Sequence, residues 1–404
     1  MILKKQGFSF LTGAASAGLL AVLAPGAWAQ NSPVLPNQID RSVIRPGTRS
    51  LGLGGTILFG SGVSAAAYNP AAISQNRGFG VGVDLVGRSE NVDVAEVKDI
   101  IDSVEELNDA VEGGDLPEES FNDLFEIARG KTGRPLRATA TPSVGVSLGI
   151  SRFSTGVLAF SEAIADVRIS ATGVSPNRRL DVGGGLLGLS TVAVPVSLRV
   201  GGLKSDYGTV GVNLKMMRAD YLAASFNADE NPITAGAQSV TGTTFDAVDD
   251  AKFGLDLGYI SPNLTKGKPF EVQTALAIRN VIAPKFDLRT TGTVEDAFGN
   301  QGQIAVDGSF KQQMQIDLGL RARSSLARVT GYAELHNLTK KNGGDTTFHI
   351  GAEYAPIKML ALRAGYDDDK LTAGLGLRLF GSRLDLAVSQ KPEERFALGF
   401  SFGG

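Results

Sequence analysis

The 404-residue sequence contains no cysteine, two histidines and one tryptophan. Without cysteine the chain cannot form disulfides, thiolate nucleophiles or cysteine-based zinc sites. His336 and His349 are interpreted as hydrogen-bonded residues, so we expect no metal site. No phosphate-binding loop, dinucleotide fingerprint or nucleophile motif is present. We therefore predict a protein that is not an enzyme and that needs no cofactor.

The sequence also lacks a basic excess and, beyond its N-terminus, any long apolar run. Its formal net charge of −3 argues against a nucleic-acid partner, because proteins that bind nucleic acid usually present a basic stripe. A transmembrane helix needs about 18 apolar residues in succession, and no segment after Ala29 supplies them. Any membrane span is therefore expected to consist of β-strands.

The N-terminus has the pattern of a secretory signal. Lys4-Lys5 precedes an apolar stretch from Phe8 to about Leu23, and Ala27-Trp28-Ala29 provides a small-x-small cleavage pattern. We expect residues 1–29 to be a signal peptide, with an uncleaved N-terminal anchor as the alternative. The mature chain then begins with a segment rich in proline, asparagine and serine, which should be weakly structured.

From residue 78 onward, short segments alternate between apolar and polar residues. Leu371, Leu375 and Leu379 share one face of a predicted strand, and Thr372 and Arg378 share the other. Alternation with period two indicates a β-strand, because successive side chains point to opposite faces of a sheet. We predict an all-β domain over residues 78–404, with about 14 strands that follow one another as an antiparallel meander. Three of these predicted strands are Leu186–Val200, Tyr207–Tyr221 and Phe270–Leu288, and a long loop is predicted at Arg289–Phe310.

One helical insert interrupts the predicted strands, at about residues 91–132. Val97, Ile101 and Val104 lie at helical spacing, and Phe121 and Phe125 share a face of a second helix. We interpret the insert as an amphipathic helical hairpin that packs on the rim of the sheet. A partner-binding element is the alternative.

Two patterns favour a transmembrane barrel over a soluble sandwich. The connections between predicted strands alternate between long and short, as in outer-membrane barrels with short turns on one rim. In most strands one face avoids charge, as Ile316 and Leu318 do opposite Asp317 and Arg321. Because every backbone group in lipid must be paired, such a wall must close on itself. The strand Phe153–Ser170 fits less well, since neither of its faces is free of polar residues.

Several short motifs resemble those of a known family. Arg49-Ser50-Leu51-Gly52-Leu53-Gly54-Gly55, followed by Ala67-Tyr68-Asn69-Pro70-Ala71, resembles the N-terminal segment of the FadL/TodX outer-membrane transport superfamily. Gly254-Leu255-Asp256-Leu257-Gly258 and Leu362-Arg363-Ala364-Gly365-Tyr366 are similar to its conjugal-transfer TraF-like branch. The resemblance spans most of the mature chain and implies a barrel in the bacterial outer membrane, surrounded by lipid.

The resemblance also implies a hatch, because members of the superfamily fold an N-terminal segment into the barrel lumen. Residues 30–77 would then form a periplasmic lead and this hatch. Small hydrophobic molecules would pass it. The alternative, implied by the TraF-like branch, is a structural part of a conjugation or secretion apparatus, with envelope proteins as partners and without transport. The expected hatch residues are Gly54, Gly55, Asn69, Pro70 and Ala71, and the polar lumen residues expected to hold them are Arg279, Arg321, Glu353, Arg363 and Arg378.

The chain departs from this family in two respects. Its single tryptophan, Trp28, lies in the expected signal peptide, so an aromatic girdle would have to consist of tyrosine and phenylalanine. The chain also ends in two glycines, whereas the assembly signals of such barrels usually end on an aromatic residue. We expect Phe400 and Phe402 to serve as the assembly signal.

Overall fold

The computed structural model describes most of the chain after residue 46. The described residues are 47–60, 63–76, 78–90, 118–131, 135–175, 177–201, 206–229, 241–266, 268–288, 290–295, 301–306, 309–341, 344–368, 370–389 and 393–403. The expected signal peptide, the lead up to residue 46 and the first predicted helix of the insert lie outside them.

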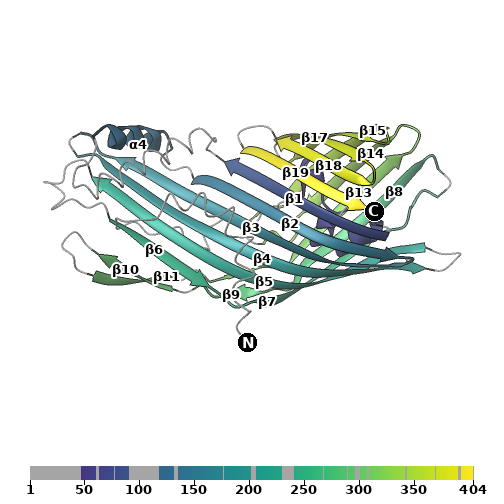
Figure 1. The fold of residues 1–404 in the computed structure, drawn as a ribbon, viewed down its shortest axis with the longest axis horizontal. Coiled ribbons are helices and arrows are strands. Elements are labelled where there is room, and N and C mark those ends of the chain that lie inside the picture. The colour runs from purple at the N-terminus through teal and green to yellow at the C-terminus, as the bar shows by residue number, and fades with distance from the viewer. Residues whose placement is uncertain are drawn as a thin grey trace.

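The fold is a closed antiparallel barrel (Figure 1). Fifteen strands form one sheet, and the pairing of β4 with β5 closes it. The wall itself has 14 strands, because β6 (Thr241–Val248) and β7 pair with successive parts of β5. The predicted fold class and strand number are confirmed. The wall strands are β1 (Gly78–Glu90), β2 (Pro135–Ile150), β3 (Phe153–Thr172), β4 (Arg179–Gly201), β5 (Asp206–Asp229), β7 (Lys252–Ile260), β8 (Phe270–Ile282), β13 (Gln315–Ser324), β14 (Val329–His336), β15 (Thr347–Ile357), β16 (Leu360–Asp367), β17 (Lys370–Leu379), β18 (Ser382–Ser389) and β19 (Glu393–Gly403).

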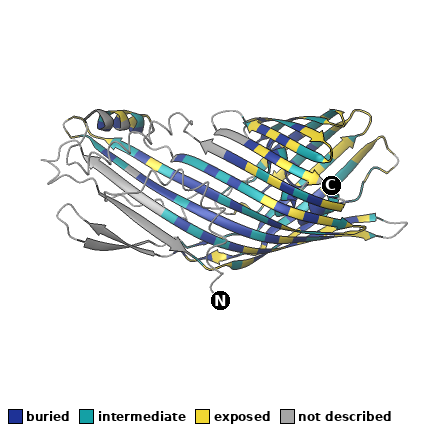
Figure 2. Cartoon of the chain, in the orientation of Figure 1, coloured by how far each residue is buried: buried dark blue, intermediate teal, exposed yellow. Residues whose placement is uncertain are grey.

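Exposed and buried side chains alternate along the wall (Figure 2). On β16, Leu362 is 44% exposed, whereas the next residue, Arg363, is 4% exposed. On β13, Leu320 is 44% exposed and Asp317 is fully buried. Apolar side chains therefore point outward and charged ones point inward, which is the arrangement of a wall that faces lipid. The predicted assignment of the two faces is confirmed, and the soluble sandwich is excluded.

The wall is much taller on one side than on the other. β5 has 24 residues and β18 has 8, whereas about 9–11 residues are enough to span a bilayer. Among the described side chains of β3 and β5, the exposed apolar residues end at Val157 and Met216. The remaining halves of these strands therefore project beyond the membrane.

Both faces of the projecting half of β3 are covered by other parts of the chain. On the lumen side, the connection between β8 and β13 packs Phe286 and Phe310 against Ile164. The opposite face carries the buried Ile169, at the end of the sheet where helix α4 (Glu118–Lys131) packs on β3 (Figure 1). Because other parts of the chain cover both faces, neither face has to be uniformly apolar. This explains why neither face of the predicted strand Phe153–Ser170 is free of polar residues.

Helix α4 is the second helix of the predicted insert. Phe121, Phe125 and Ala128 are buried on one face of it, as their helical spacing predicts. The helices among the described residues are too short or too polar to cross a bilayer.

Several predicted bounds are wrong in the projecting part of the barrel. The strands predicted at Leu186–Val200 and Tyr207–Tyr221 are the longer β4 and β5, and the strand predicted to reach Leu288 ends at Ile282. The segment predicted as a loop contains the hairpin of β10 (Thr290–Glu295) and β11 (Gln301–Val306). Two short strands, β9 (Lys285–Phe286) and β12 (Phe310–Lys311), pair beside it. The predicted strand bounds follow from the alternation of apolar, lipid-facing residues with polar ones. That alternation is lost where the strands extend beyond the membrane.

Candidate functional site

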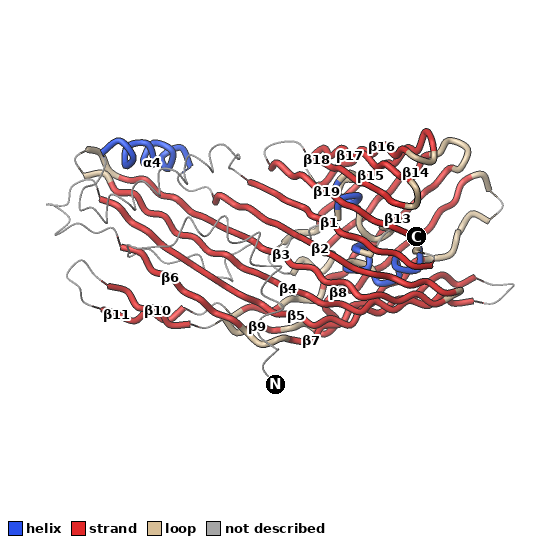
Figure 3. The backbone as a smooth tube through the Cα atoms, in the orientation of Figure 1, coloured by secondary structure: helices blue, strands red, loops and turns tan. Residues whose placement is uncertain are grey.

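Residues 47–60 and 63–76 lie inside the barrel, and we call them the inner segment (Figure 3). It contains three short helices, α2 (Thr48–Leu51), η1 (Ser64–Ala67) and η2 (Pro70–Gln75). An apolar cluster joins the inner segment to the wall. It consists of Leu53, Ile57, Leu58, Phe59, Ala65, Ala71 and Ala72 of the segment and Ile260, Ala275, Ala277 and Tyr332 of the wall.

Asn69, Pro70 and Ala71 form the beginning of η2. The buried side chain of Asn69 accepts the Ala71 N–H at 3.1 Å and donates to the Leu58 carbonyl at 3.0 Å. Pro70 stands in the first turn of the helix, where its missing N–H would have no partner in any case. The asparagine thus caps η2 and ties it to an earlier part of the inner segment.

The wall that faces this turn carries glycines where any larger residue would collide with it. A Cβ on Gly211 of β5 would lie 2.3 Å from the Ala71 nitrogen. A Cβ on Gly258 of β7 would lie 2.1 Å from the Asn69 amide oxygen. The backbone of η2 can therefore lie directly against the sheet.

Gly54 and Gly55 form a second close contact, with the strands β15 and β16. Their φ values of +68° and +78° lie in the left-handed region that glycine adopts without strain. The Gly54 N–H donates to the Thr372 hydroxyl at 2.9 Å, and its carbonyl is 2.9 Å from Nδ1 of His349. A Cβ on Gly365 would lie 2.1 Å from the Gly54 nitrogen.

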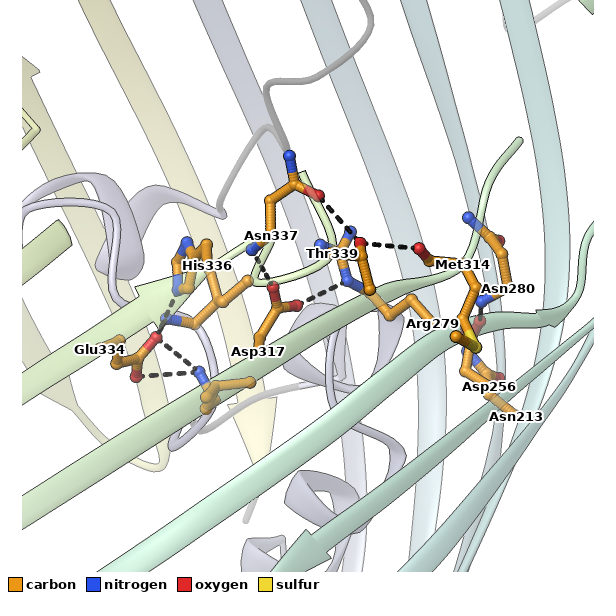
Figure 4. Close-up of polar contacts among 12 residues, drawn as sticks. Asn213, Asp256, Arg279, Asn280, Met314, Asp317, Glu334, His336, Asn337 and Thr339 are labelled. Atoms are coloured by element: carbon orange, nitrogen blue, oxygen red, sulfur yellow. Dashed lines mark hydrogen bonds and ion pairs between the residues drawn. The ribbon is translucent and has the colours of Figure 1, made fainter. Parts of the chain in front are cut away.

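Glu334 of β14 bonds to the middle of the inner segment. Its carboxylate accepts the N–H groups of Ile57 at 2.8 Å and Leu58 at 3.1 Å, and it is 2.8 Å from the His336 ring (Figure 4). The His336 and His349 rings stack with centroids 4.0 Å apart. Both histidines are buried and form hydrogen bonds, as predicted from the sequence.

Arg49 of α2 forms an ion pair with Glu353 at 3.1 Å. Burial alone would lower the pKa of Arg49, but Tyr332 and the Glu353 carboxylate outweigh burial and raise that pKa, so the guanidinium stays charged. Arg363 donates to the same carboxylate at 2.7 Å and also pairs with Asp385 at 2.8 Å. A buried charge needs such partners, because an unpaired one would be very costly.

The structure places the five predicted lumen residues on the inner side of the wall, but in different roles. Glu353 contacts Arg49 of the inner segment, and Arg321 donates to Gln75 at 3.1 Å and lies over the Phe59 ring. Arg279 pairs with the wall residue Asp317 at 2.9 Å (Figure 4). Arg363 likewise pairs with carboxylates of the wall, and Arg378 is exposed near a barrel mouth.

The two predicted assembly-signal residues lie on the outer face of β19. Phe400 is 51% exposed and Phe402 is 48% exposed. β19 pairs with both β18 and β1, so these side chains belong to the lipid-facing surface next to the point where the first and last strands meet.

A polar cluster that the sequence does not predict lies at an irregularity between β7 and β8 (Figure 4). Three residues of β8 lie opposite Asp256 alone, and Asn280 has a φ of +53° there. Asp256 accepts the Asn280 N–H at 2.8 Å and pairs with Lys215 of β5 at 2.7 Å. Lys215 and Asp256 lie on the inner faces of their strands. By alternation Asn280 falls on the outer, apolar face of β8, and only the irregularity, which cannot be read from the sequence pattern, turns it inward.

A cavity of about 650 Å³ opens between the inner segment and the short-turn rim, the barrel end with the turns 325–328 and 358–359. We call it the arginine cavity. Its charged lining residues are Arg49, Arg321, Arg323, Arg328, Lys358, Arg378, Arg383 and Glu353.

Two other cavities border the inner segment. One of about 730 Å³ is lined by Arg152 and Arg199 and shares Arg321 with the arginine cavity. The other has a volume of about 260 Å³ and shares Arg49, Arg378 and Arg383 with the arginine cavity. Charged residues line all three, together with apolar residues such as Phe59, Val63 and Ile260.

Solved structures with a similar fold are hydrocarbon transporters. The toluene transporter TbuX of Ralstonia pickettii is 14% identical with a TM-score of 0.53, and the comparison covers 88% of this chain and 98% of TbuX. The toluene transporter TodX of P. putida is 16% identical with a TM-score of 0.51 and coverages of 89% and 98%. The CymD monoaromatic hydrocarbon channel is 14% identical with a TM-score of 0.50 and coverages of 88% and 96%.

These identities establish the fold and leave the cargo open. A comparison with curated proteins finds no match. The family model described as "F plasmid transfer operon, TraF, protein" matches residues 66–375, from the inner segment to β17. This match covers most of the chain and confirms the predicted resemblance. The chain therefore belongs to the F plasmid transfer operon TraF protein family, on a barrel fold shared with the TodX-type hydrocarbon channels.

Proposed function

We propose that the protein is an outer-membrane barrel that admits small hydrophobic molecules, with the inner segment as its hatch. The observation that carries this proposal is the way the segment is held. Besides the apolar cluster that it shares with the wall, it contacts the wall at glycines and through directional bonds, of which those from Glu334 and Thr372 are examples. Such a segment can shift without unfolding the wall.

The apolar cluster in the projecting half of the lumen supports a hydrophobic cargo. Phe286, Leu288 and Phe310 meet Met217 and Tyr221 there. These side chains are 0–5% exposed, so a small hydrophobic molecule would reach them only when the connection between β8 and β13 moves aside. Burial of its apolar area against them would then favour its entry. The solved barrels with the same fold are named as transporters of toluene and monoaromatic hydrocarbons, which agrees with such a cargo.

Whole-cell uptake of N-phenyl-1-naphthylamine, a neutral aromatic dye that fluoresces in phospholipid, tests this function. Cells with an intact lipopolysaccharide layer should take up the dye faster when they produce the protein than when they carry an empty vector. Phe286→Asp should abolish the gain, because it places a charge in the apolar cluster. Phe380→Asp, at a fully exposed turn position, is the control. Cells that produce this variant should take up the dye as fast as cells with the unaltered protein. Equal uptake with and without the protein would contradict the transport proposal.

Membership in the TraF family favours a second candidate, a structural part of a conjugation-type apparatus without transport. The charged residues in all three cavities agree with it, because transport of a neutral hydrophobic molecule does not need them. Crosslinking in cells that contain the conjugation machinery would then recover envelope proteins of that machinery with this chain, and dye uptake would be unchanged. Recovery of barrel-assembly factors alone would contradict this candidate.

A further inference from the structure

The arginine cavity has a strong imbalance of charge that hydrophobic transport does not require. Seven cationic side chains and one carboxylate line it. The carboxylate, Glu353, is already shared by Arg49 and Arg363 at 3.1 and 2.7 Å. Arg383 is paired with Asp385 at 2.8 Å. The other cations of the lining, Arg321, Arg323, Arg328, Lys358 and Arg378, border a space of about 650 Å³ whose lining has no second carboxylate.

Several of these cations have neutral partners. Arg321 donates to the side-chain amides of Gln75 and Gln273, and Arg328 donates to the Pro356 carbonyl. Neutral acceptors hold a guanidinium in place and leave its charge uncompensated. Arg378 is exposed, as are Arg323, Arg328 and Lys358.

The position of the cavity strengthens the field of these charges. The inner segment closes one end of it, and the wall surrounds it with low-dielectric protein, so field lines are focused into the space. Arginine presents a planar fork of donors that matches the oxygens of a carboxylate or phosphate. Arg321 and Arg378 lie on the lumen side of their strands, so the occupant comes from the water of the mouth and is not a lipid of the surrounding bilayer.

We propose that the arginine cavity is a binding site for a small water-soluble anion that carries a phosphate or carboxylate group. Arg321 and Arg378 are the residues assigned to hold it. Arg49 and Glu353 form the end of the cavity at the inner segment, and Arg383 beside them is paired with Asp385 at 2.8 Å. The site does not depend on transport, and binding is measurable whether or not the barrel conducts.

Equilibrium dialysis of the purified full-length barrel in an uncharged detergent, with radiolabelled inorganic phosphate, tests the site. We expect saturable binding of one phosphate that weakens as sodium chloride is added, because salt screens the attraction. Choline, a cation of similar size, should not bind. Arg378→Gln removes one charge-assisted hydrogen bond and should weaken binding about tenfold.

Arg152→Gln is the matched control, because Arg152 lies at the same rim but lines the neighbouring cavity. It should bind phosphate as the unaltered barrel does. Heat-dependent migration in gel electrophoresis verifies that each variant is a folded barrel. Two results would overturn the proposal. One is the absence of saturable binding to the folded unaltered barrel, and the other is an equal loss in both variants, which would reflect net charge alone.

Discussion

Gly258 lies so close to Asn69 that a Cβ atom on this glycine would stand 2.1 Å from the Asn69 amide oxygen. The wall and the inner segment therefore fit together only if position 258 has no side chain. Asn69 caps η2 and bonds to Leu58, so a displacement of its side chain would release two parts of the inner segment together.

The first prediction follows from this contact. Gly258→Ala should displace the turn at Asn69, with a cost of about 1–3 kcal/mol typical of overpacking. The current through single barrels in planar bilayers should become larger and noisier. Gly331→Ala is the control, since a Cβ there would meet its nearest neighbour at 4.0 Å. Identical currents in the two variants would show that the inner segment is not held at this contact.

The second prediction concerns Glu334. Glu334→Gln turns an amide NH₂ toward one of the backbone N–H groups of Ile57 and Leu58, so at least one bond to the inner segment is lost. A hydrogen bond to a charged group contributes about 1.5–3 kcal/mol, and we expect more frequent open events in the same current recordings. Glu271→Gln, an exposed carboxylate near the rim, should leave them unchanged. If Glu334→Gln does not change the frequency of open events, the bonds from Glu334 do not hold the inner segment in place.

The third prediction uses two neighbouring residues that face opposite sides. Leu362 is exposed on the outer face of β16, and Ala361 borders the arginine cavity. Leu362→Arg should impair assembly, because an arginine at mid-bilayer costs about 2–4 kcal/mol. Ala361→Arg should assemble normally, since its side chain can reach the water of the cavity. The yield of heat-modifiable barrel in membranes measures both, and equal yields would mean that the faces are misassigned.

The fourth prediction tests whether the part around α4, which projects beyond the membrane, can lose its packing while the barrel stays folded. Phe125 is buried in α4, stacks on Phe121 with centroids 6.0 Å apart, and lies under Arg178. Phe125→Ala should cost about 3–5 kcal/mol of local packing and expose the α4 region to protease while the barrel stays folded. Glu126→Ala, an exposed site on the same helix, should remain resistant. Loss of the whole barrel in the phenylalanine variant would contradict an independent projecting part.

The sequence predicts the membrane part of the wall well for a physical reason. On β17 and β18 one face meets lipid and the other meets charged partners, so the chemical contrast between alternate residues is large. Leu384 and Asp385 illustrate this contrast with exposures of 39% and 8%. The same contrast predicted that Glu353 and Arg363 point into the lumen.

The sequence does not predict the projecting strands or the partners of buried charges. Ile164 and Ile169 are both buried although they lie on opposite faces of β3, so alternation is lost there. The pairing of Arg49 with Glu353 joins residues 304 positions apart, and strand order around a closed wall decides such contacts. The resemblance identified Asn69, Pro70 and Ala71, but it gave no indication of Glu334.

Spin labelling tests the central claim, that the apolar faces of the wall meet lipid and the polar faces enclose the inner segment. Because the chain has no cysteine, single cysteines can be introduced at Leu320, Leu335 and Leu362 on the outer face and at Thr330 and Ala361 beside the arginine cavity. In lipid vesicles, labels at the three leucine positions should collide with oxygen and be shielded from a water-soluble nickel chelate. Labels at the other two positions should show the reverse. Leucine-site labels that are shielded from both reagents would mean that these side chains meet in a dry protein core, and the account would be wrong.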